Sequence, residues 1–222
     1  MNFLTKKSIS QLNTALSRDD LLRRSRVLII DDERPELVDD LKKAHFAVDY
    51  EPDIDASKID LIEKQLYDLV LLDFGNVGRA FGDDEGLSLL RHIKRVNPAI
   101  VVLSYTSKAL GSAQADFYRL SDIVLLKDAG ISESLEKIEE GLRKAHSLEN
   151  VWAGLLAVAR IKPGSREDLQ WQDMLLRGIN KESKMQQLKE GVTKALTSDE
   201  AQKVGLVLFT KAIELAVKAA AG

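Results

Sequence analysis

Short apolar runs alternate with amphipathic segments through the middle of the chain. The runs are rich in Val, Ile and Leu and are bounded by polar residues, which is typical of buried β-strands. They occupy residues 26–30, 46–50, 67–72, 100–103 and 123–126. The segments between them have the spacing of helices, which we expect over 36–41, 61–66, 87–95 and 109–120, with a last one starting at Ser132. Pro35 suits the first turn of the first of these helices.

Strands that alternate with helices predict an α/β domain with a parallel, doubly wound sheet. Right-handed crossovers leave few topologies for such a sheet. We expect the five-stranded, flavodoxin-like order 2-1-3-4-5 in a domain that covers residues 26–146.

The two ends of the chain have no clear strand pattern. Residues 1–25 are predicted to form a helical arm, with Leu4, Ile9, Leu12 and Leu16 near helical spacing and a cap at Ser17 or Asp19. Residues 147–222 are predicted to form a helical domain, with helices over 167–178, 181–196 and 199–221. Ser198 is a plausible cap for the last of these, and the run 204–209 fits either a strand or a helix.

Apolar residues continue at alternating three- and four-residue spacing from the α/β domain into this C-terminal region. They are Leu135, Ile138, Leu142, Ala145, Trp152, Leu156 and Ala159. One interpretation is a single helix over 132–160 that forms a coiled-coil-like seam. The other is two separate helices, which Gly141 and Gly154 favour because glycine weakens a helix interior.

Composition limits the possible function classes. The 222 residues are 45% hydrophobic and carry a net charge of -3, so the chain can bury a core and is not a wholly basic nucleic-acid binder. Cysteine is absent, which excludes disulfides, thiolate zinc sites and Cys nucleophiles. The longest uncharged stretch, 96–107, is too short to span a bilayer. Without a signal-like N-terminus, we expect a cytoplasmic protein that does not enter the membrane.

Charge is unevenly distributed along the chain. Residues 26–146 contain 16 basic and 24 acidic side chains, a net of -8. The first 25 residues have 5 basic and 2 acidic side chains, and residues 147–222 have 11 and 9. An acidic middle between mildly basic ends indicates that the segments have different roles.

The acidic residues include three that end predicted strands. Asp31 and Asp32 follow the first strand and Asp73 follows the third. Ligands bind at the carboxyl ends of parallel strands, and neighbouring strands would bring these carboxylates together. A double aspartate alone is as often a helix cap as a metal site, but three converging carboxylates are tenable around Mg²⁺. Lys127 after the fifth strand would add a cation, and Ser104 at the end of the fourth would add a hydroxyl or be simply buried. The set suits phosphoryl transfer to a carboxylate nucleophile.

The ordered motifs resemble the receiver domain of two-component response regulators. They are VLIIDDERP, YDLVLLD, EGLSLLRHIK, VVLS and IVLLK, and together they cover residues 26–146. The resemblance implies that Asp73 accepts a phosphoryl group from a sensor histidine kinase or phosphotransfer protein.

The resemblance also assigns roles to the other site residues. It implies that Asp31 and Asp32 hold Mg²⁺ with Asp73, and that the backbone carbonyl of Gly75 is a further ligand. It further implies that Ser104 is the hydroxyl that moves toward the phosphoryl group and that Lys127 is the lysine beside it.

Three features depart from the family pattern. Asp128 stands where a proline usually follows the lysine, and Val124 stands at the usual aromatic position, for which Tyr105 or Tyr118 could substitute. Gly86 follows Asp73 by 13 residues, so the intervening loop is longer than usual. This loop could change the lifetime of the phosphoryl group or create a contact surface.

The C-terminal region leaves three readings open. The chain could be a phosphorylation-switched protein, not itself an enzyme, whose helical ends dimerise or bind a protein partner. It could be a transcription regulator with an atypical helical DNA-binding domain, although its basic residues are scattered and form no stripe. It could also be a pseudo-receiver scaffold that is never phosphorylated.

Overall fold

The computed structural model describes residues 9, 12, 16–55, 57–63, 66–107 and 112–221. These residues belong to two compact units. Residues 16–145 form one unit, and the described residues from 146 onward, with Ile9 and Leu12, belong to the other.

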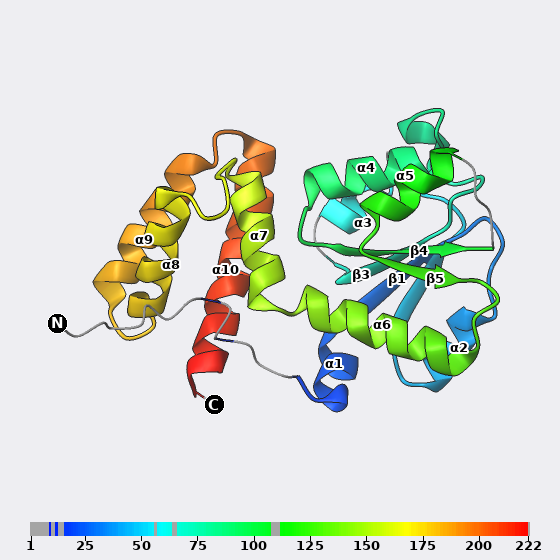
Figure 1. Ribbon diagram of the computed structural model, residues 1–222, viewed down its shortest axis with the longest axis horizontal. Helices are drawn as coiled ribbons and strands as arrows, with labels where there is room; N and C mark the ends of the chain where they lie inside the picture. The colour runs from blue at the N-terminus through cyan, green and yellow to red at the C-terminus, as the bar shows by residue number, and fades with distance from the viewer. Residues whose placement is uncertain are drawn as a thin grey trace. The chain divides into compact units, whose positions relative to one another are not determined.

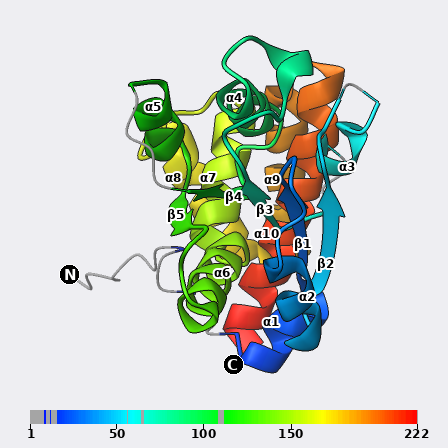
Figure 2. The ribbon, with the colours of Figure 1, turned by 90° about the vertical axis from the view of Figure 1, so that its right-hand side faces the viewer.

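A parallel five-stranded sheet lies at the centre of the first unit. Its order is β2-β1-β3-β4-β5, as predicted (Figure 2). The strands are β1 (Arg26–Ile30), β2 (Ala47–Glu51), β3 (Leu69–Leu72), β4 (Val101–Thr106) and β5 (Ile123–Leu126). Ile30 of β1 pairs with Leu72 of β3, which pairs in turn with Ser104 of β4. This register brings the carboxyl ends of β1 and β3 side by side.

Helices cover both faces of the sheet (Figure 1). One face carries α1 (Arg18–Arg24), α2 (Leu37–Lys43) and α6 (Ile131–Ala145), and the other carries α3 (Asp60–Glu63), α4 (Gly86–Val96) and α5 (Ser112–Leu120). Successive strand residues point to opposite faces, so Ile29 and Leu71 enter the first core while Ile30 and Leu72 enter the second. Burial on both faces explains why the central strands β1 and β3 are almost entirely apolar, whereas the edge strand β2 also carries Asp49 and Glu51.

The beginning of the sheet unit differs from the predicted boundary at residue 26. Ser17 caps α1, because its Oγ accepts a hydrogen bond from the backbone N–H of Asp20 at 3.2 Å. Leu21 of α1 is fully buried in the core beneath α6, so this helix belongs with the sheet and not with a separate arm. Arg18 adds an ion pair of 2.7 Å with Glu139 of α6. Of the other predicted arm residues, Leu4 lies outside the described part of the chain.

Helix α6 ends at Ala145, and the next helix, α7 (Leu148–Val158), begins three residues later. The prediction of one continuous helix over 132–160 is therefore wrong, and two separate helices form. Ser147 has an extended backbone, and its Oγ accepts a hydrogen bond from the N–H of Asn150 at 3.2 Å. A side-chain cap of this kind starts a new helix even where the apolar spacing continues.

The second unit is helical, and it contains α7, α8 (Arg166–Gly178), α9 (Glu182–Ala195) and α10 (Asp199–Ala221). Figure 1 shows α7 beside α10 and α8 beside α9. The run 204–209 lies within α10, so its helical interpretation is correct, and Ser198 accepts from the N–H of Ala201 as a cap. The side chains of Trp152 and Trp171 are buried in this unit. Nε1 of Trp152 donates a hydrogen bond of 2.8 Å to Oδ1 of Asp168, which is also buried.

No helix in the described ranges combines the length and the hydropathy needed to cross a membrane.

Candidate functional site

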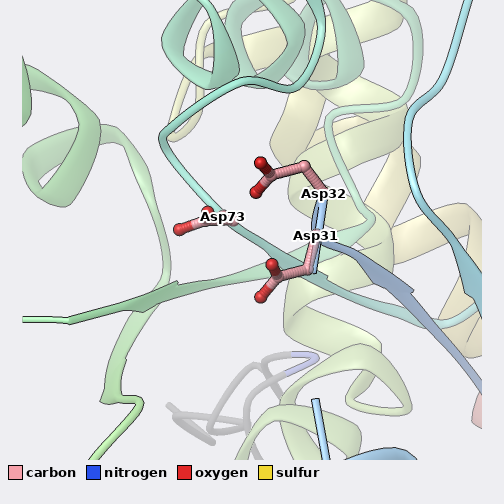
Figure 3. Close-up of side chains that lie close together, drawn as sticks. All are labelled: Asp31, Asp32 and Asp73. Atoms are coloured by element: carbon pink, nitrogen blue, oxygen red, sulfur yellow. The ribbon is translucent and has the colours of Figure 1, made fainter. Parts of the chain in front are cut away.

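Three carboxylates meet at the carboxyl ends of β1 and β3. Asp31 and Asp32 directly follow β1, and Asp73 directly follows β3. Figure 3 shows their side chains extending toward the same side of the strand ends. Each offers one oxygen, and these oxygens all lie within 4.8 Å of one another. The structure therefore brings together the acidic residues that the sequence indicated.

Lys127 joins this cluster from the end of β5. Its Nζ lies 2.7 Å from Oδ2 of Asp31 and 3.2 Å from Oδ2 of Asp73. The ammonium group also lies 5.5 Å from the centre of the Tyr105 ring, which packs beneath it as a cation–π contact. One cation thus bridges two largely buried carboxylates.

Burial and the neighbouring charges together raise the pKa values of Asp73 and Lys127. Burial raises the pKa of Asp73 above its ordinary value, the neighbouring Asp31 raises it further, and Lys127 opposes both without cancelling them. Burial alone would lower the pKa of Lys127, but Asp31 and Asp73 outweigh burial and raise it. Lys127 is therefore a permanently charged ammonium group at neutral pH, and it offsets part of the carboxylate repulsion.

The cluster has the chemistry of a divalent-cation site. Asp31 is fully buried, and its Oδ2 lies 2.7 Å from Nζ of Lys127. Lys127 is a single positive charge beside three carboxylates, so a divalent cation would offset the repulsion that remains among them. Oxygen ligands alone are what Mg²⁺ prefers. Asp31, Asp32 and Asp73 fit this ion, and Gly75 lies two residues beyond Asp73 in the adjoining loop.

Ser104 lies in β4, where it pairs with Leu72, the residue before Asp73. Ser104 is fully buried in β4, and its Oγ is 3.4 Å from the carbonyl oxygen of Ile123 and 3.3 Å from Oγ of Ser121. Strand β4 continues two residues further, to Thr106. The carbonyl of Thr106 accepts the backbone N–H of Lys127 at 2.8 Å, so this threonine lies level with the site lysine.

Thr106 was missed because the predicted strand stopped at residue 103. The available signal was its position on the same strand face as Ser104, since side chains at i and i+2 share a face. Tyr118 of α5 approaches Thr106, with its hydroxyl oxygen 3.4 Å from Oγ1. Of the two tyrosines considered as substitutes for the family's aromatic residue, Tyr118 therefore contacts Thr106 and Tyr105 packs under Lys127. Val124, at the usual aromatic position, is 42% exposed.

The long loop after β3 folds back over the acidic cluster. It includes a short 3₁₀ helix, η2 (Arg79–Phe81), and ends at α4. Nδ2 of Asn76 donates to Oδ2 of Asp32 at 2.9 Å. At the far end of the loop, the N–H of Gly86 donates to the carbonyl of Phe74 at 3.0 Å, and a side chain at Gly86 would collide with the carbonyl of Asp73. The loop is thereby fixed at both ends to the residues around the site.

Solved structures to which this chain is similar include response regulators and their receiver domains. A CheY-like receiver domain protein from Methanospirillum hungatei is 24% identical; the match covers 55% of this chain and 95% of that chain, with a TM-score of 0.44. A response regulator from Clostridium difficile is 21% identical over 54% of this chain and 97% of that chain, with a TM-score of 0.45. The receiver domain of RcsB from Salmonella enterica, determined with the phosphomimetic BeF₃⁻, is 20% identical over 53% and 89%, with a TM-score of 0.43.

Models of known protein families and curated proteins gave no match to the sequence. The observed strand order is that of the flavodoxin-like receiver fold.

Proposed function

We propose that this chain is a response regulator that accepts a phosphoryl group on Asp73, with Mg²⁺, from a phosphohistidine of a sensor kinase or phosphotransfer protein. The observation that carries the proposal is the position of Lys127, whose Nζ lies within 3.2 Å of Asp73 and 2.7 Å of Asp31 beside a third carboxylate. A carboxylate nucleophile, a fixed cation and a set of oxygen ligands are the parts that phosphoryl transfer requires.

Each residue has a separate task in the proposed reaction. An oxygen of Asp73 attacks phosphorus while the bond from phosphorus to the donor's imidazole nitrogen breaks. When the other ring nitrogen of that imidazole carries a proton, this leaves an acyl phosphate on Asp73 and a neutral histidine on the donor. Lys127 stays charged and stabilises the phosphoryl oxygens. Asp31 and Asp32 would hold Mg²⁺, which supplies further charge neutralisation.

Thr106 is the hydroxyl that we assign to the phosphorylated state. It ends β4 beside Lys127, whereas Ser104 lies two residues deeper and already contacts Ser121 and Ile123. Movement of Thr106 toward the phosphoryl group would break its contact with Tyr118 of α5. This is a physical route by which phosphorylation could reach the α5 face of the sheet.

The second unit is the proposed output, as a surface for a protein partner or a second copy of the chain. The last helix, α10, exposes Leu206, Val207 and Val217 at 38%, 47% and 44% of their surfaces. Exposed apolar side chains on one helix support protein binding more than DNA binding.

The proposal is tested by incubating the full chain with acetyl phosphate and Mg²⁺ and measuring its intact mass. We expect one added phosphoryl group, none in Asp73→Asn, and an unchanged gain in Asp83→Asn, which removes an exposed carboxylate from the loop after β3. An unchanged wild-type mass would instead favour the unphosphorylated scaffold.

The output assignment needs its own experiment. Retention on heparin at low salt, with steep release as salt is added, would favour the DNA-binding alternative. We expect no such retention, and we expect BeF₃⁻ with Mg²⁺ to change the apparent size of the wild-type chain but not of Asp73→Asn.

A further inference from the structure

We propose that Asn76 is a positioning residue that orients Asp32 for the divalent cation, and that Arg79 and Glu85 hold Asn76 in place. We call Asn76, Arg79 and Glu85 the loop triad. The inference rests on the proposed function, since it concerns the same metal site. It assigns a role to the long loop after β3, which the proposed chemistry does not use.

The first contact of the loop triad is with the metal site itself. Asp32 is exposed, so its side chain would be free to sample several rotamers if nothing held it. Nδ2 of Asn76 donates to its Oδ2 at 2.9 Å, across 44 positions of sequence. The hydrogen bond restricts the orientation of the Asp32 carboxylate, which lies in the acidic cluster with Asp31 and Asp73.

The second contact fixes the direction of the Asn76 amide. Nη2 of Arg79 lies 2.6 Å from Oδ1 of Asn76 and 3.4 Å from Oε1 of Glu85. A guanidinium group only donates and an ionised carboxylate only accepts. The amide oxygen of Asn76 must therefore face Arg79, and its NH₂ group must face Asp32. Arg79 thus acts on Asp32 through Asn76.

The backbone of the loop has an unusual conformation at Asn76 and at Glu85, and hydrogen bonds hold it there. Asn76 and Glu85 have φ values of +58° and +49°, in a region that residues with side chains rarely adopt. Oε2 of Glu85 accepts the backbone N–H of Asn76 at 3.2 Å, which ties the two positions together. Oδ1 of Asp53 accepts the N–H of Gly78 at 2.6 Å, so the loop is also anchored from the β2 side. Backbone conformations of this kind persist where surrounding contacts determine them, often at functional sites.

Partners that hydrogen-bond to a metal ligand set its orientation, and losing one typically weakens metal affinity about 10- to 100-fold. We therefore expect Asn76→Ala to weaken binding of a divalent cation about 10-fold. Arg79→Ala should weaken it less, because the amide stays but loses its fixed direction. The double variant should bind no more weakly than Asn76→Ala, since both residues act through one hydrogen bond.

The experiment measures Mn²⁺ binding to the full chain by electron paramagnetic resonance, which reports free Mn²⁺ directly and needs no phosphorylation. Arg91→Ala is the matched control, because it removes an exposed arginine paired with Asp84 of the same loop without touching Asn76. Thermal unfolding in EDTA establishes that each variant is folded. Arg79 is 65% exposed, so its variant tests the idea even if Asn76→Ala unfolds.

The outcomes separate the two proposals. If the wild type and Arg91→Ala bind Mn²⁺ and both loop-triad variants bind more weakly in the expected order, the inference is supported. If the folded variants bind as tightly as the wild type, or more tightly, the inference is overturned while the metal site stands. If the wild type binds no Mn²⁺, the metal site and the inference both fail. The same holds if the wild type binds Mn²⁺ but Asp31→Asn does not weaken this binding.

Discussion

Nζ of Lys127 lies 3.2 Å from Oδ2 of Asp73, although the two residues follow strands that are separated by β4 in the sheet. The contact crosses the carboxyl end of β4, where Thr106 holds the backbone of Lys127 through a hydrogen bond of 2.8 Å. The half-buried ammonium group of Lys127 therefore influences the charge state of Asp73 and which ligands this carboxylate can bind.

Replacing Lys127 with Ala should slow phosphorylation of Asp73 by acetyl phosphate about 100-fold, because one preorganised positive charge is removed from the phosphoryl site. Loss of the cation should also raise the pKa of Asp73 further, since Lys127 and the backbone N–H of Phe74 are the groups that oppose burial and Asp31. The rate is measured from the growth of the phosphorylated mass with time. Lys43→Ala removes an exposed lysine from α2 and should leave the rate unchanged. Equal rates in both variants would contradict the role of Lys127.

Thr106→Ala should abolish the response of the chain to BeF₃⁻ and Mg²⁺, whereas Ser104→Ala should retain it. The reason is that Thr106 ends β4 at the site, while Ser104 is enclosed within the sheet. The response is measured as a change in apparent size or in amide chemical shifts. The reverse pattern would restore Ser104 as the responding hydroxyl.

Asp122→Asn should destabilise the sheet unit by about 3 kcal/mol, because it leaves the largely buried Lys94 without its counter-ion. The Asp122 carboxylate contacts Lys94, lies 2.7 Å from Nζ of Lys144 and accepts the N–H of Val102 at 2.8 Å. Chemical unfolding followed by circular dichroism measures the loss. Asp116→Asn, which removes an exposed carboxylate, should cost much less.

Asp122 should also make the free energy of unfolding of the sheet unit depend on pH. Burial alone would raise the pKa of Asp122, but Lys94, Lys144 and the N–H of Val102 outweigh burial and lower it below the ordinary 3.8. The stability that ionised Asp122 contributes is complete above that value and is lost as pH falls through the lower folded pKa. Below about pH 4 the wild type should therefore lose stability more steeply than Asp122→Asn. Parallel curves for the two proteins would contradict this.

Asp168→Ala should destabilise the helical unit by about 3 kcal/mol, because three donors lose their acceptor in a buried place. Asp168 is 3% exposed and accepts from Trp152, from the N–H of Gly164 and from Gln172. Both tryptophans of the chain lie in this unit, so their fluorescence follows its unfolding. Asp173→Asn, at an exposed position paired with Arg177, is the control and should change stability little.

The sheet and its acidic cluster could be predicted because their signals are local. The strands β1, β3 and β5 are mainly apolar runs, and Asp31, Asp73 and Lys127 each stand directly after one of them. Parallel pairing then brings these positions together. The sequence alone therefore carried both the strand order and the main charges of the site.

The parts that could not be predicted depend on contacts between distant residues or on single caps. The Asn76–Asp32 hydrogen bond joins two loops 44 positions apart, which no periodicity reveals. The end of β4 at Thr106 depends on its pairing with β5, since Ser-Tyr-Thr lacks the apolar character of the preceding residues. The break before α7 depends on one capping hydroxyl, that of Ser147, within a spacing that otherwise continues.

Borohydride trapping identifies directly which aspartate carries the phosphoryl group, and we expect that residue to be Asp73. An acyl phosphate on aspartate is reduced by borohydride to homoserine, which marks the site in a peptide map. After treatment with acetyl phosphate and Mg²⁺, the account predicts homoserine at position 73 and at neither Asp31 nor Asp32. Reduction at another aspartate, or at none while the protein remains folded, would contradict it.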